Sequence, residues 1–459
     1  MFPVMHSKTL LFLGFVSSLS LCAPSPHRRD STNLITLKSR SSAEGVCFDA
    51  QVNIGSTVFE LNADTGSSDL WVARTGFQCY NRTDITRLAP QEACMYDEIK
   101  KYDPTTSSTF VQIQNETFGA KYGVGIALGI VGTEEVAVGG ITVDRQTIGV
   151  ADRITVPSDG IASGILGLGH PILTSAHPGN TVANDTISLL TNKVIYQPLV
   201  YRMHAQGLIP SWFSLALERL PKGRTTGKGG VFGLGALPDV QTVGPFVTAP
   251  VEVTESLPTE LSGGKITEWT LSVQGVAWRA GNSTGSFTHN TTRFQAVVDS
   301  GTFYNEFPQG IADSINAEFV PPATYDDALG NYIVDCDATP PSLSVTIANT
   351  TFSQSPDDMI FQLPNGTCLS SLTRASMGEG ITFNFLGGVW LQNVVAVFDF
   401  GKEEMRFAQR AGNSAESNSS TTGTTIPPVS SGGQSKSPQI GATGALALLA
   451  WGIGSLILR

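Results

Sequence analysis

Hydrophobic residues recur along this chain in short runs that turn-forming residues separate. The runs 294–298 and 397–400 are rich in Val and Phe, and Gly, Pro, Asn and Asp residues are frequent between such runs. Runs of this length and composition are typical of β-strands joined by tight turns. Long stretches of helical periodicity are scarce, although short helices are expected around 187–191 and 310–318. The pattern predicts a mainly β protein.

Two apolar stretches near the ends of the chain do not fit this pattern. Lys8 precedes the apolar run 9–21, and small residues follow, which is the order of a secretory signal peptide. We therefore predict a signal peptide over 1–22 and passage of the chain through an oxidising compartment. A second apolar stretch, 440–458, follows a segment rich in Ser, Thr, Gly and Pro. We interpret 411–438 as a linker and 439–459 as a hydrophobic anchor signal.

This second stretch suggests attachment to a membrane. A glycolipid-attachment signal has small residues at the attachment site, a polar spacer of about 8–12 residues and a removable apolar tail. Ser430, Ser431 and Gly432 have the required size and spacing. The alternative is a single transmembrane helix, because about 20 apolar residues can cross a bilayer. We favour the lipid anchor, which would hold the protein at the cell surface or outside the cell, on the plasma membrane or cell wall.

The polar and basic segment 23–42 follows the signal peptide. It contains Arg28-Arg29 and Lys38-Ser39-Arg40, which are candidate cleavage sites, so we predict a short prosegment. A disordered N-terminal tail is the alternative. The 459 residues exceed one typical compact domain. We predict an N-terminal lobe over 43–240 and a C-terminal lobe over 241–410.

Charge and cysteine content narrow the class of protein. The chain has 28 Lys and Arg against 39 Asp and Glu, a net charge of -11, which argues against a nucleic-acid partner. Its His and Cys residues lack metal-ligand spacing, so neither a metal nor another cofactor is expected. Five cysteines follow the signal peptide. Pairing within each lobe would join Cys79 to Cys94 and Cys336 to Cys368 and leave Cys47 over, but the sequence alone leaves the connectivity open.

Eight Asn-X-Ser/Thr sequences support passage through the secretory pathway. These candidate glycosylation sites are Asn81, Asn115, Asn184, Asn282, Asn290, Asn349, Asn365 and Asn418.

One short element occurs twice. A β-type run leads into Asp64-Thr65-Gly66-Ser67, and a second leads into Asp299-Ser300-Gly301-Thr302. A single Asp-Thr-Gly most often marks a turn. Two copies lying 235 residues apart (299 minus 64), one in each predicted lobe, indicate instead that two similar halves each supply one carboxyl group to a shared cleft.

Two adjacent carboxyl groups can act together as an acid and a base. Groups about 3 Å apart cannot both ionise cheaply, so they share one proton. The ionised member can deprotonate a water molecule while the protonated member hydrogen-bonds a peptide carbonyl. Glycine permits close backbone approach after each Asp. The hydroxyl groups of Thr65, Ser67, Ser300 and Thr302 are expected to orient the carboxyl groups and tie the loops together.

These motifs resemble those of the pepsin-like aspartic proteases, in particular fungal secreted or glycolipid-anchored members. The resemblance runs from about Cys47 to Ala408. It includes the flap-like sequence 120–125, the hydrophobic-hydrophobic-Gly segments 164–169 and 385–391, and a closing strand at 397–400. By this resemblance the fold is bilobal, with two antiparallel β lobes and the active site in the cleft between them.

The resemblance also implies roles for residues beyond the Asp pair. Tyr122 and Gly123 would lie in a flap over the cleft, with the Tyr122 hydroxyl reaching the indole of Trp71; ordinary core packing is the alternative for both aromatic residues. Peptide or protein substrates would bind as an added strand. The chain would be an aspartic endopeptidase, active as a monomer and made as a zymogen.

Some positions depart from the family pattern. Val124 and Phe303 replace residues that are commonly polar, Gly388 replaces a frequent Asp, and the prosegment is short. Phe303 is therefore a candidate for filling a substrate subsite and narrowing specificity. The departures also leave two other interpretations, a catalytically silent binding module and a structural surface glycoprotein. Retention of both Asp residues and the four neighbouring hydroxyl groups favours the enzyme.

Overall fold

The computed structural model describes residues 33–42, 45–82, 84–96, 98–123, 125–181, 191–221, 223–378 and 381–411. Several sequence predictions fall outside these residues. They are the signal peptide, the first part of the prosegment, Val124, Asn184, most of the helix expected around 187–191, Asn418, the linker, Ser430, Ser431, Gly432 and the anchor signal.

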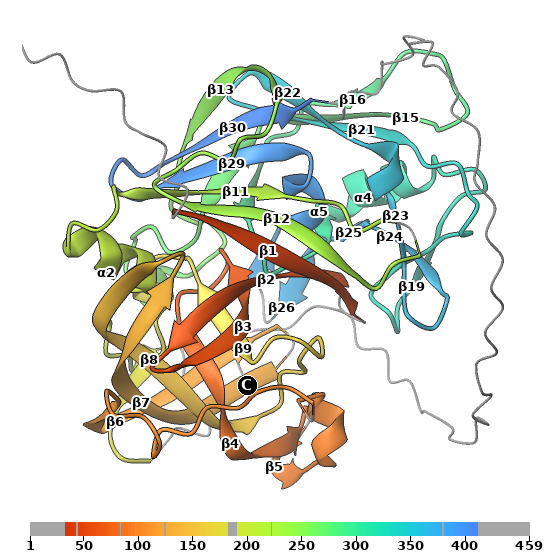
Figure 1. Ribbon diagram of the computed structural model, residues 1–459. Helices are drawn as coiled ribbons and strands as arrows, with labels where there is room; N and C mark the ends of the chain where they lie inside the picture. Colours follow the sequence, from red (N-terminus) through yellow and green to blue (C-terminus); the bar gives the residue numbers. More distant parts are fainter. Residues whose placement is uncertain are drawn as a thin grey trace, which may run out of the picture. The chain divides into compact units, whose positions relative to one another are not determined.

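The fold is mainly β, as predicted, and its largest element is a 15-stranded sheet (Figure 1). The first ten strands belong to this sheet. Most of them alternate buried apolar residues with outward-facing ones, which is the pattern of a strand with one buried face. They are β1 (Leu34–Ser42), β2 (Gly45–Ile54), β3 (Thr57–Asp64), β4 (Leu70–Asn81), β5 (Asp84–Leu88), β6 (Val111–Tyr122), β7 (Gly125–Val138), β8 (Ile141–Ile154), β9 (Gly164–Gly167) and β10 (Ala176–Pro178).

The same sheet continues into the second half of the chain. Its order runs from β2 through β1, β12, β11, β29 and β30 to β13, so strands from both halves lie side by side. These later strands are β11 (Trp212–Leu217), β12 (Thr226–Leu234), β13 (Thr242–Pro250), β29 (Val394–Asp399) and β30 (Glu404–Arg410). Antiparallel pairing of β11 with β29 joins the two halves directly.

Smaller sheets form the rest of the second half. Their strands are β14 (Thr270–Val273), β15 (Gly275–Arg279), β16 (Thr288–Asn290), β17 (Phe294–Val298), β18 (Asn305–Phe307), β19 (Thr324–Asp326), β20 (Asn331–Ile333), β21 (Ser342–Ile347), β22 (Thr350–Gln354), β23 (Ile360–Gln362), β24 (Cys368–Ser370), β25 (Leu372–Arg374), β26 (Ser376–Gly378), β27 (Ile381–Phe383) and β28 (Phe385–Leu386).

Helices are few and short in the described part of the chain. The helix α4 lies where the sequence predicted one, and it buries Ile311 and Ile315 on one face. The helices are α2 (Leu199–Ala205), α3 (Thr259–Ser262), α4 (Gln309–Asn316) and α5 (Gly388–Leu391), with 3-10 turns η2 (Gln91–Cys94), η3 (Pro171–Leu173) and η4 (Pro356–Asp358).

One hydrophobic core extends through both halves. At its centre the Phe213 and Phe398 rings stack with centroids 4.8 Å apart, and Trp269 meets Phe398 edge-on at 5.1 Å. These residues come from β11, β29 and the segment before β14, and all three are fully buried. Burial of such large aromatic side chains from distant parts of the sequence holds the two halves together.

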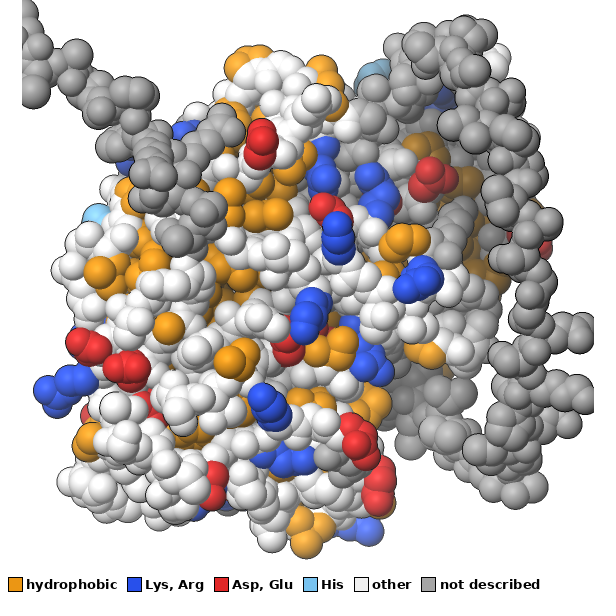
Figure 2. All heavy atoms as spheres, viewed as in Figure 1, with side chains coloured by type: hydrophobic (Ala, Val, Ile, Leu, Met, Phe, Trp, Pro, Cys, Tyr) orange, Lys and Arg blue, Asp and Glu red, His pale blue; other side chains and the backbone are white. Residues whose placement is uncertain are grey.

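The strand β1 includes part of the predicted prosegment. Ile35, Leu37 and Ser39 are buried, whereas Thr36 and Lys38 are exposed, so this basic segment follows the period of a strand. It pairs with β2 on one side and β12 on the other. Figure 2 shows this face, on which Lys and Arg side chains lie among acidic and uncharged ones. Residues 34–42 are therefore an integral part of the sheet.

Two disulfides are present in the described chain. Cys79 is bonded to Cys94, and Cys336 to Cys368. Each of these bonds links two residues within the same half of the chain. Cys47 lies on β2 and takes part in neither bond.

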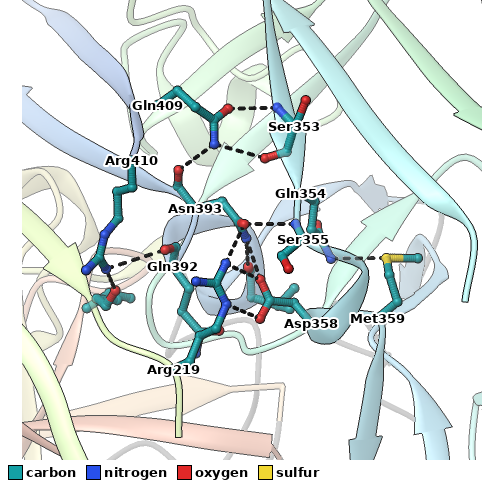
Figure 3. A network of polar contacts seen from close by, with 12 residues as sticks. Arg219, Ser353, Gln354, Ser355, Asp358, Met359, Gln392, Asn393, Gln409 and Arg410 are labelled. Atoms are coloured by element: carbon teal, nitrogen blue, oxygen red, sulfur yellow. Dashed lines mark hydrogen bonds and ion pairs between the residues drawn. The ribbon is translucent and has the colours of Figure 1, made fainter. Parts of the chain in front are cut away.

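A buried polar network joins the second half to the shared sheet (Figure 3). At its centre Asn393 is fully buried between α5 and β29. Arg219, which follows β11, pairs with Asp358 of η4 and also donates to the Asn393 side chain at 2.7 Å. Gln409 of β30 donates to the backbone carbonyls of Ser353 and Asn393. Paired in this way, these polar groups can be buried at low cost.

Candidate active site

The first Asp-containing loop begins where β3 ends, at Asp64. The strand β9 lies parallel to β3 with Asp64 opposite Gly167, and the backbone N–H of Leu168 donates to the Asp64 carbonyl at 2.8 Å. A Cβ atom on Gly167 would lie 2.4 Å from the backbone of Ser68. The hydrophobic-hydrophobic-Gly segment thus packs directly behind the loop, and a glycine is needed there.

The second loop has the same construction. The strand β17 ends one residue before Asp299, and β28 runs parallel to it, with Val298 opposite Leu386. The backbone N–H of Asp299 donates to the Leu386 carbonyl at 3.1 Å. A Cβ atom on Gly387 would collide with the Tyr304 carbonyl. Both Asp residues therefore lie at the ends of strands, on loops backed by a parallel strand.

Hydrogen bonds join the two loops at Thr65 and Ser300. The backbone N–H of each residue donates to the hydroxyl of the other, at 3.1 and 2.9 Å. Both residues are buried. The sequence predicted that these hydroxyl groups tie the loops together, and the observed bonds have that geometry.

The two carboxyl groups face each other across this junction. A Cβ atom on Gly66 would lie 2.6 Å from the Asp299 carboxyl oxygens, and one on Gly301 would lie closer still to Asp64 Oδ1. The Gly66 and Gly301 backbone N–H groups donate to Asp64 and Asp299 respectively, each at 2.8 Å. Each carboxyl group thus lies against the glycine of the opposite loop, and only glycine leaves room for it.

The environments of the two Asp residues differ. Asp64 Oδ2 accepts a further hydrogen bond from the Ser67 hydroxyl at 2.5 Å, whereas the Thr302 hydroxyl makes no such bond to Asp299 among the described residues. Burial and the neighbouring Asp299 raise the pKa of Asp64, although Ser67 and Gly66 oppose this. The raised pKa favours the protonated form of Asp64.

Tyr122 and Trp71 meet beside the loops. The indole N–H of Trp71 donates to the Tyr122 hydroxyl at 2.8 Å. Trp71 is fully buried on β4, and Tyr122 is the last residue of β6. Gly123 is exposed in the turn that leads to β7, where a side chain would meet nothing within 4 Å. The Trp71–Tyr122 bond thus ties the end of the β6–β7 hairpin to β4.

Phe303 packs among aromatic residues. Its ring centroid lies 5.0 Å from that of Phe361 and 5.3 Å from that of Tyr304, and the residue is 7% exposed. Gly45 approaches it so closely that a Cβ atom there would collide with the ring. Gly388 is buried at the start of α5, against Phe48. Core packing thus accounts for the bulk of Phe303.

Sequence analysis missed two further acidic residues near the pair. Asp69 is buried, and it accepts hydrogen bonds from the Ser175 backbone at 2.8 Å and from the Tyr196 hydroxyl. Glu268 precedes the buried Trp269 and interacts electrostatically with both catalytic candidates. The Asp69 position within the first motif was a usable signal. No comparable sequence signal marks Glu268, because its proximity to Asp64 and Asp299 depends on strand pairing.

Two kinds of feature are absent from the described residues. No group of three or more His, Cys, Asp and Glu side chains there is arranged to hold a metal ion. None of the helices within the described ranges combines the length and apolar character that a membrane crossing requires.

Comparison with known proteins places this arrangement in context. The family model for eukaryotic aspartyl proteases matches residues 48–410. A probable aspartic-type endopeptidase of Aspergillus fumigatus is 39% identical over 395 residues, which is 84% of this chain and 82% of the relative. Rhizopuspepsin of Rhizopus chinensis is 28% identical over 365 residues, covering 78% and 77%.

A solved structure shares the fold. The crystal structure of an aspartic proteinase from Irpex lacteus superposes with a TM-score of 0.58 over 84% of this chain and 99% of its own, at 20% sequence identity. The two-lobed β architecture predicted from the sequence is thereby confirmed.

Proposed function

Because this chain belongs to the eukaryotic aspartyl protease family, we propose that it is an endopeptidase in which Asp64 and Asp299 activate water for attack on a peptide bond. The observation that carries the proposal is the reciprocal arrangement of the two loops, in which each carboxyl group lies against the glycine of the other. Two carboxyl groups held this closely share one proton.

The chemistry follows from that shared proton. The ionised carboxylate accepts a proton from a water molecule as the water oxygen attacks the carbonyl carbon of the substrate. The protonated carboxyl group hydrogen-bonds the carbonyl oxygen and transfers its proton to the resulting tetrahedral centre. The carboxyl group that took up the water proton then protonates the amine as the C–N bond breaks. At the same time the other carboxylate takes back a proton from a hydroxyl group of the tetrahedral centre, which becomes the carboxylic acid product, so the pair again holds one proton on its starting member.

The β6–β7 hairpin is proposed to hold the substrate over the pair. An extended peptide would bind through backbone hydrogen bonds, with its side chains directed alternately into pockets. Tyr122 is fixed by the buried Trp71, and the exposed Gly123 keeps the hairpin turn free of a side chain. Phe303 would contribute to specificity indirectly, because its ring packs against Phe361 and supports that side chain beside the second loop.

One assay tests the proposal. We expect the purified protein to hydrolyse a denatured protein substrate at acid pH, with inhibition by pepstatin. Asp64→Asn and Asp299→Asn should each abolish hydrolysis while the variants still fold, as judged by thermal denaturation. Asp337→Asn makes the same chemical change at an exposed position and should leave activity unchanged. Absence of wild-type activity from acid to neutral pH, or activity that survives both active-site substitutions, would overturn the proposal.

We propose that maturation removes the prosegment before Leu34. Cleavage at Lys38-Ser39-Arg40 would cut β1, which pairs on both sides, whereas cleavage at Arg28-Arg29 would leave that strand intact. N-terminal sequencing of the secreted protein tests this. A mature chain that starts after Arg40 would contradict it.

The protein is proposed to reach the cell surface as a glycoprotein attached by a C-terminal glycolipid. In support, every described asparagine of the candidate glycosylation sequences is at least partly exposed, namely Asn81, Asn115, Asn282, Asn290, Asn349 and Asn365. Phosphatidylinositol-specific phospholipase C should release the protein from cells if the anchor is present. Retention after treatment would favour a transmembrane helix instead.

A further inference from the structure

A third carboxyl group, that of Glu268, lies beside the Asp64–Asp299 pair. Glu268 is two residues before β14, which runs antiparallel to β17 with Thr270 opposite Val297. The pairing continues beyond the strands, because the backbone N–H of Val298 donates to the Trp269 carbonyl at 2.9 Å. One further step in this register places Glu268 directly opposite Asp299.

Residues directly opposite each other in an antiparallel pair point to the same face of the sheet, with Cβ atoms about 4.5–5.5 Å apart. The neighbouring Trp269 points to the other face, where it is fully buried and its indole donates to the Leu168 carbonyl. Glu268 is therefore directed to the face on which Asp299 meets Asp64. Glu268 as a whole is partly exposed, but its Oε2 atom is buried and has no hydrogen-bond partner among the described residues.

The charges around Glu268 are mostly of its own sign. Burial raises its pKa to about 8, with Asp299 and then Asp64 adding to the rise. Lys193 acts in the opposite direction, and its ammonium group donates to the Leu173 carbonyl at 3.4 Å. Below that pH Glu268 is neutral, and above it the side chain adds a negative charge next to the pair.

We propose that Glu268 is a positioning residue for the proton of the Asp64–Asp299 pair, and that its negative charge extends catalysis further into the alkaline range. Loss of the shared proton leaves two carboxylates face to face. A third carboxylate nearby makes that loss less favourable, because it repels the additional negative charge. The pair therefore keeps its catalytic proton to a higher pH than it would alone. This inference rests on the proposed protease function.

The pH dependence of kcat/KM tests the inference, because it reports ionisations of the free enzyme. In Glu268→Gln we expect the alkaline limb to move to lower pH by about one unit, as loss of a charge at this distance implies. The acid limb should stay in place, because Glu268 is neutral there. Glu268→Asp keeps the carboxyl group and should restore most of the wild-type limb. Glu260→Gln removes an exposed acidic side chain on α3 and should change neither limb.

The outcomes separate the two proposals. If wild-type hydrolysis depends on Asp64 and the alkaline limb of Glu268→Gln coincides with that of the wild type, the inference about Glu268 is wrong and the protease function stands. An equal loss of kcat/KM at every pH would also overturn it, because that result indicates a merely structural role. If wild-type hydrolysis does not depend on Asp64, the proposed function itself fails. Thermal denaturation checks folding, and Glu268→Met replaces the Gln variant if the latter does not fold.

Discussion

Thr65 and Ser300 each donate a backbone N–H to the hydroxyl of the other, although 235 residues separate them in the sequence. Each hydroxyl then donates to a carbonyl in the opposite half, Thr65 to Val298 at 2.8 Å and Ser300 to Ala63 at 2.7 Å. Each hydroxyl thus accepts one bond and donates one. The spacing of the two carboxyl groups is consequently fixed by four hydrogen bonds between the loops.

Replacing Thr65 by Val tests this junction. Valine has nearly the same shape, but it leaves the backbone N–H of Ser300 and the Val298 carbonyl without these partners in a buried place. We expect the free energy of unfolding to fall by about 1–3 kcal/mol for each stranded group. We also expect kcat/KM to fall at least ~10-fold, because small displacements of catalytic groups are costly.

Chemical denaturation and steady-state kinetics measure both effects. Thr248→Val, at an exposed position of β13, is the matched control and should change neither quantity. A Thr65→Val enzyme with wild-type stability and kcat/KM would show that the junction does not position the pair.

The Tyr122 hydroxyl gives a second prediction. In Tyr122→Phe the buried indole N–H of Trp71 loses its partner, and the hairpin is no longer tied to β4. We expect stability to fall by about 1 kcal/mol and kcat/KM to fall on the order of 10-fold. Tyr80→Phe removes a hydroxyl that bonds the exposed Gln78 side chain and serves as the control. Unchanged kinetics in Tyr122→Phe would support core packing as the sole role of this residue.

Local sequence patterns predicted the mainly β fold and singled out Asp64 and Asp299, whereas the bilobal arrangement was implied by the family resemblance. The elements around Asp64 and Asp299 each consist of a strand followed by a glycine-containing turn, and such signals lie within about ten residues of sequence. The short helix expected around 310–318 corresponds to α4 at 309–316. The repeat itself implied two similar halves before any contact between them was known.

Features that depend on pairing between distant segments could not be predicted. In residues 34–42 the basic side chains obscure the alternation of buried and exposed positions that is typical of a strand. The sequence therefore suggests a polar prosegment, although Leu37 and Ser39 are buried in the structure. The position of Glu268 depends on the register of β14 against β17, which the sequence does not specify. The same holds for Asp49 and Asp159, whose side chains approach only after β2 packs against the loop that follows β8.

Asp49 predicts a pH-dependent stability. It is fully buried on β2, and burial raises its pKa well above the usual value, with Asp159 and then Glu60 adding to the rise and Lys38 opposing it. A carboxyl group whose pKa is higher in the folded state favours folding when it is protonated. That contribution is complete below the unfolded-state value of about 4 and is lost as the pH rises through the raised pKa.

Asp49→Asn should therefore leave the melting temperature nearly unchanged at pH 4 and raise it by several degrees at pH 7. The amide keeps the size and hydrogen-bonding capacity of the protonated acid but cannot ionise. Differential scanning calorimetry at both pH values measures the effect, with exposed Asp337→Asn as the control. An equal shift at the two pH values would show that packing, and not ionisation, determines the result.

The network around Asn393 leads to a prediction about stability alone (Figure 3). The Asn393 side-chain oxygen accepts from Arg219 at 2.7 Å and from the Ser355 backbone at 2.9 Å. Its amide donates to Asp358 at 2.8 Å and to the Val389 carbonyl at 2.9 Å. Asn393→Ala removes all four bonds from a fully buried place, so we expect it to lower the free energy of unfolding by about 2–4 kcal/mol.

Asn393→Asp separates the two roles of this side chain. An aspartate can still accept from Arg219, but its second oxygen faces Asp358 and the Val389 carbonyl, where hydrogen-bond donors are needed. The bond to Val389 is weakened at any pH. The bond to Asp358 is restored at acid pH by one shared proton, whereas at neutral pH two carboxylates would meet in a buried place. We therefore expect a loss of stability that is smaller at pH 3–4 than at pH 7, where it approaches that of Asn393→Ala. Urea denaturation at the two pH values measures it, and Gln362→Ala at an exposed position controls for loss of an amide. Equal losses at both pH values would mean that the donated bond to Asp358 contributes little, and that the acceptor oxygen alone holds Arg219 in the network.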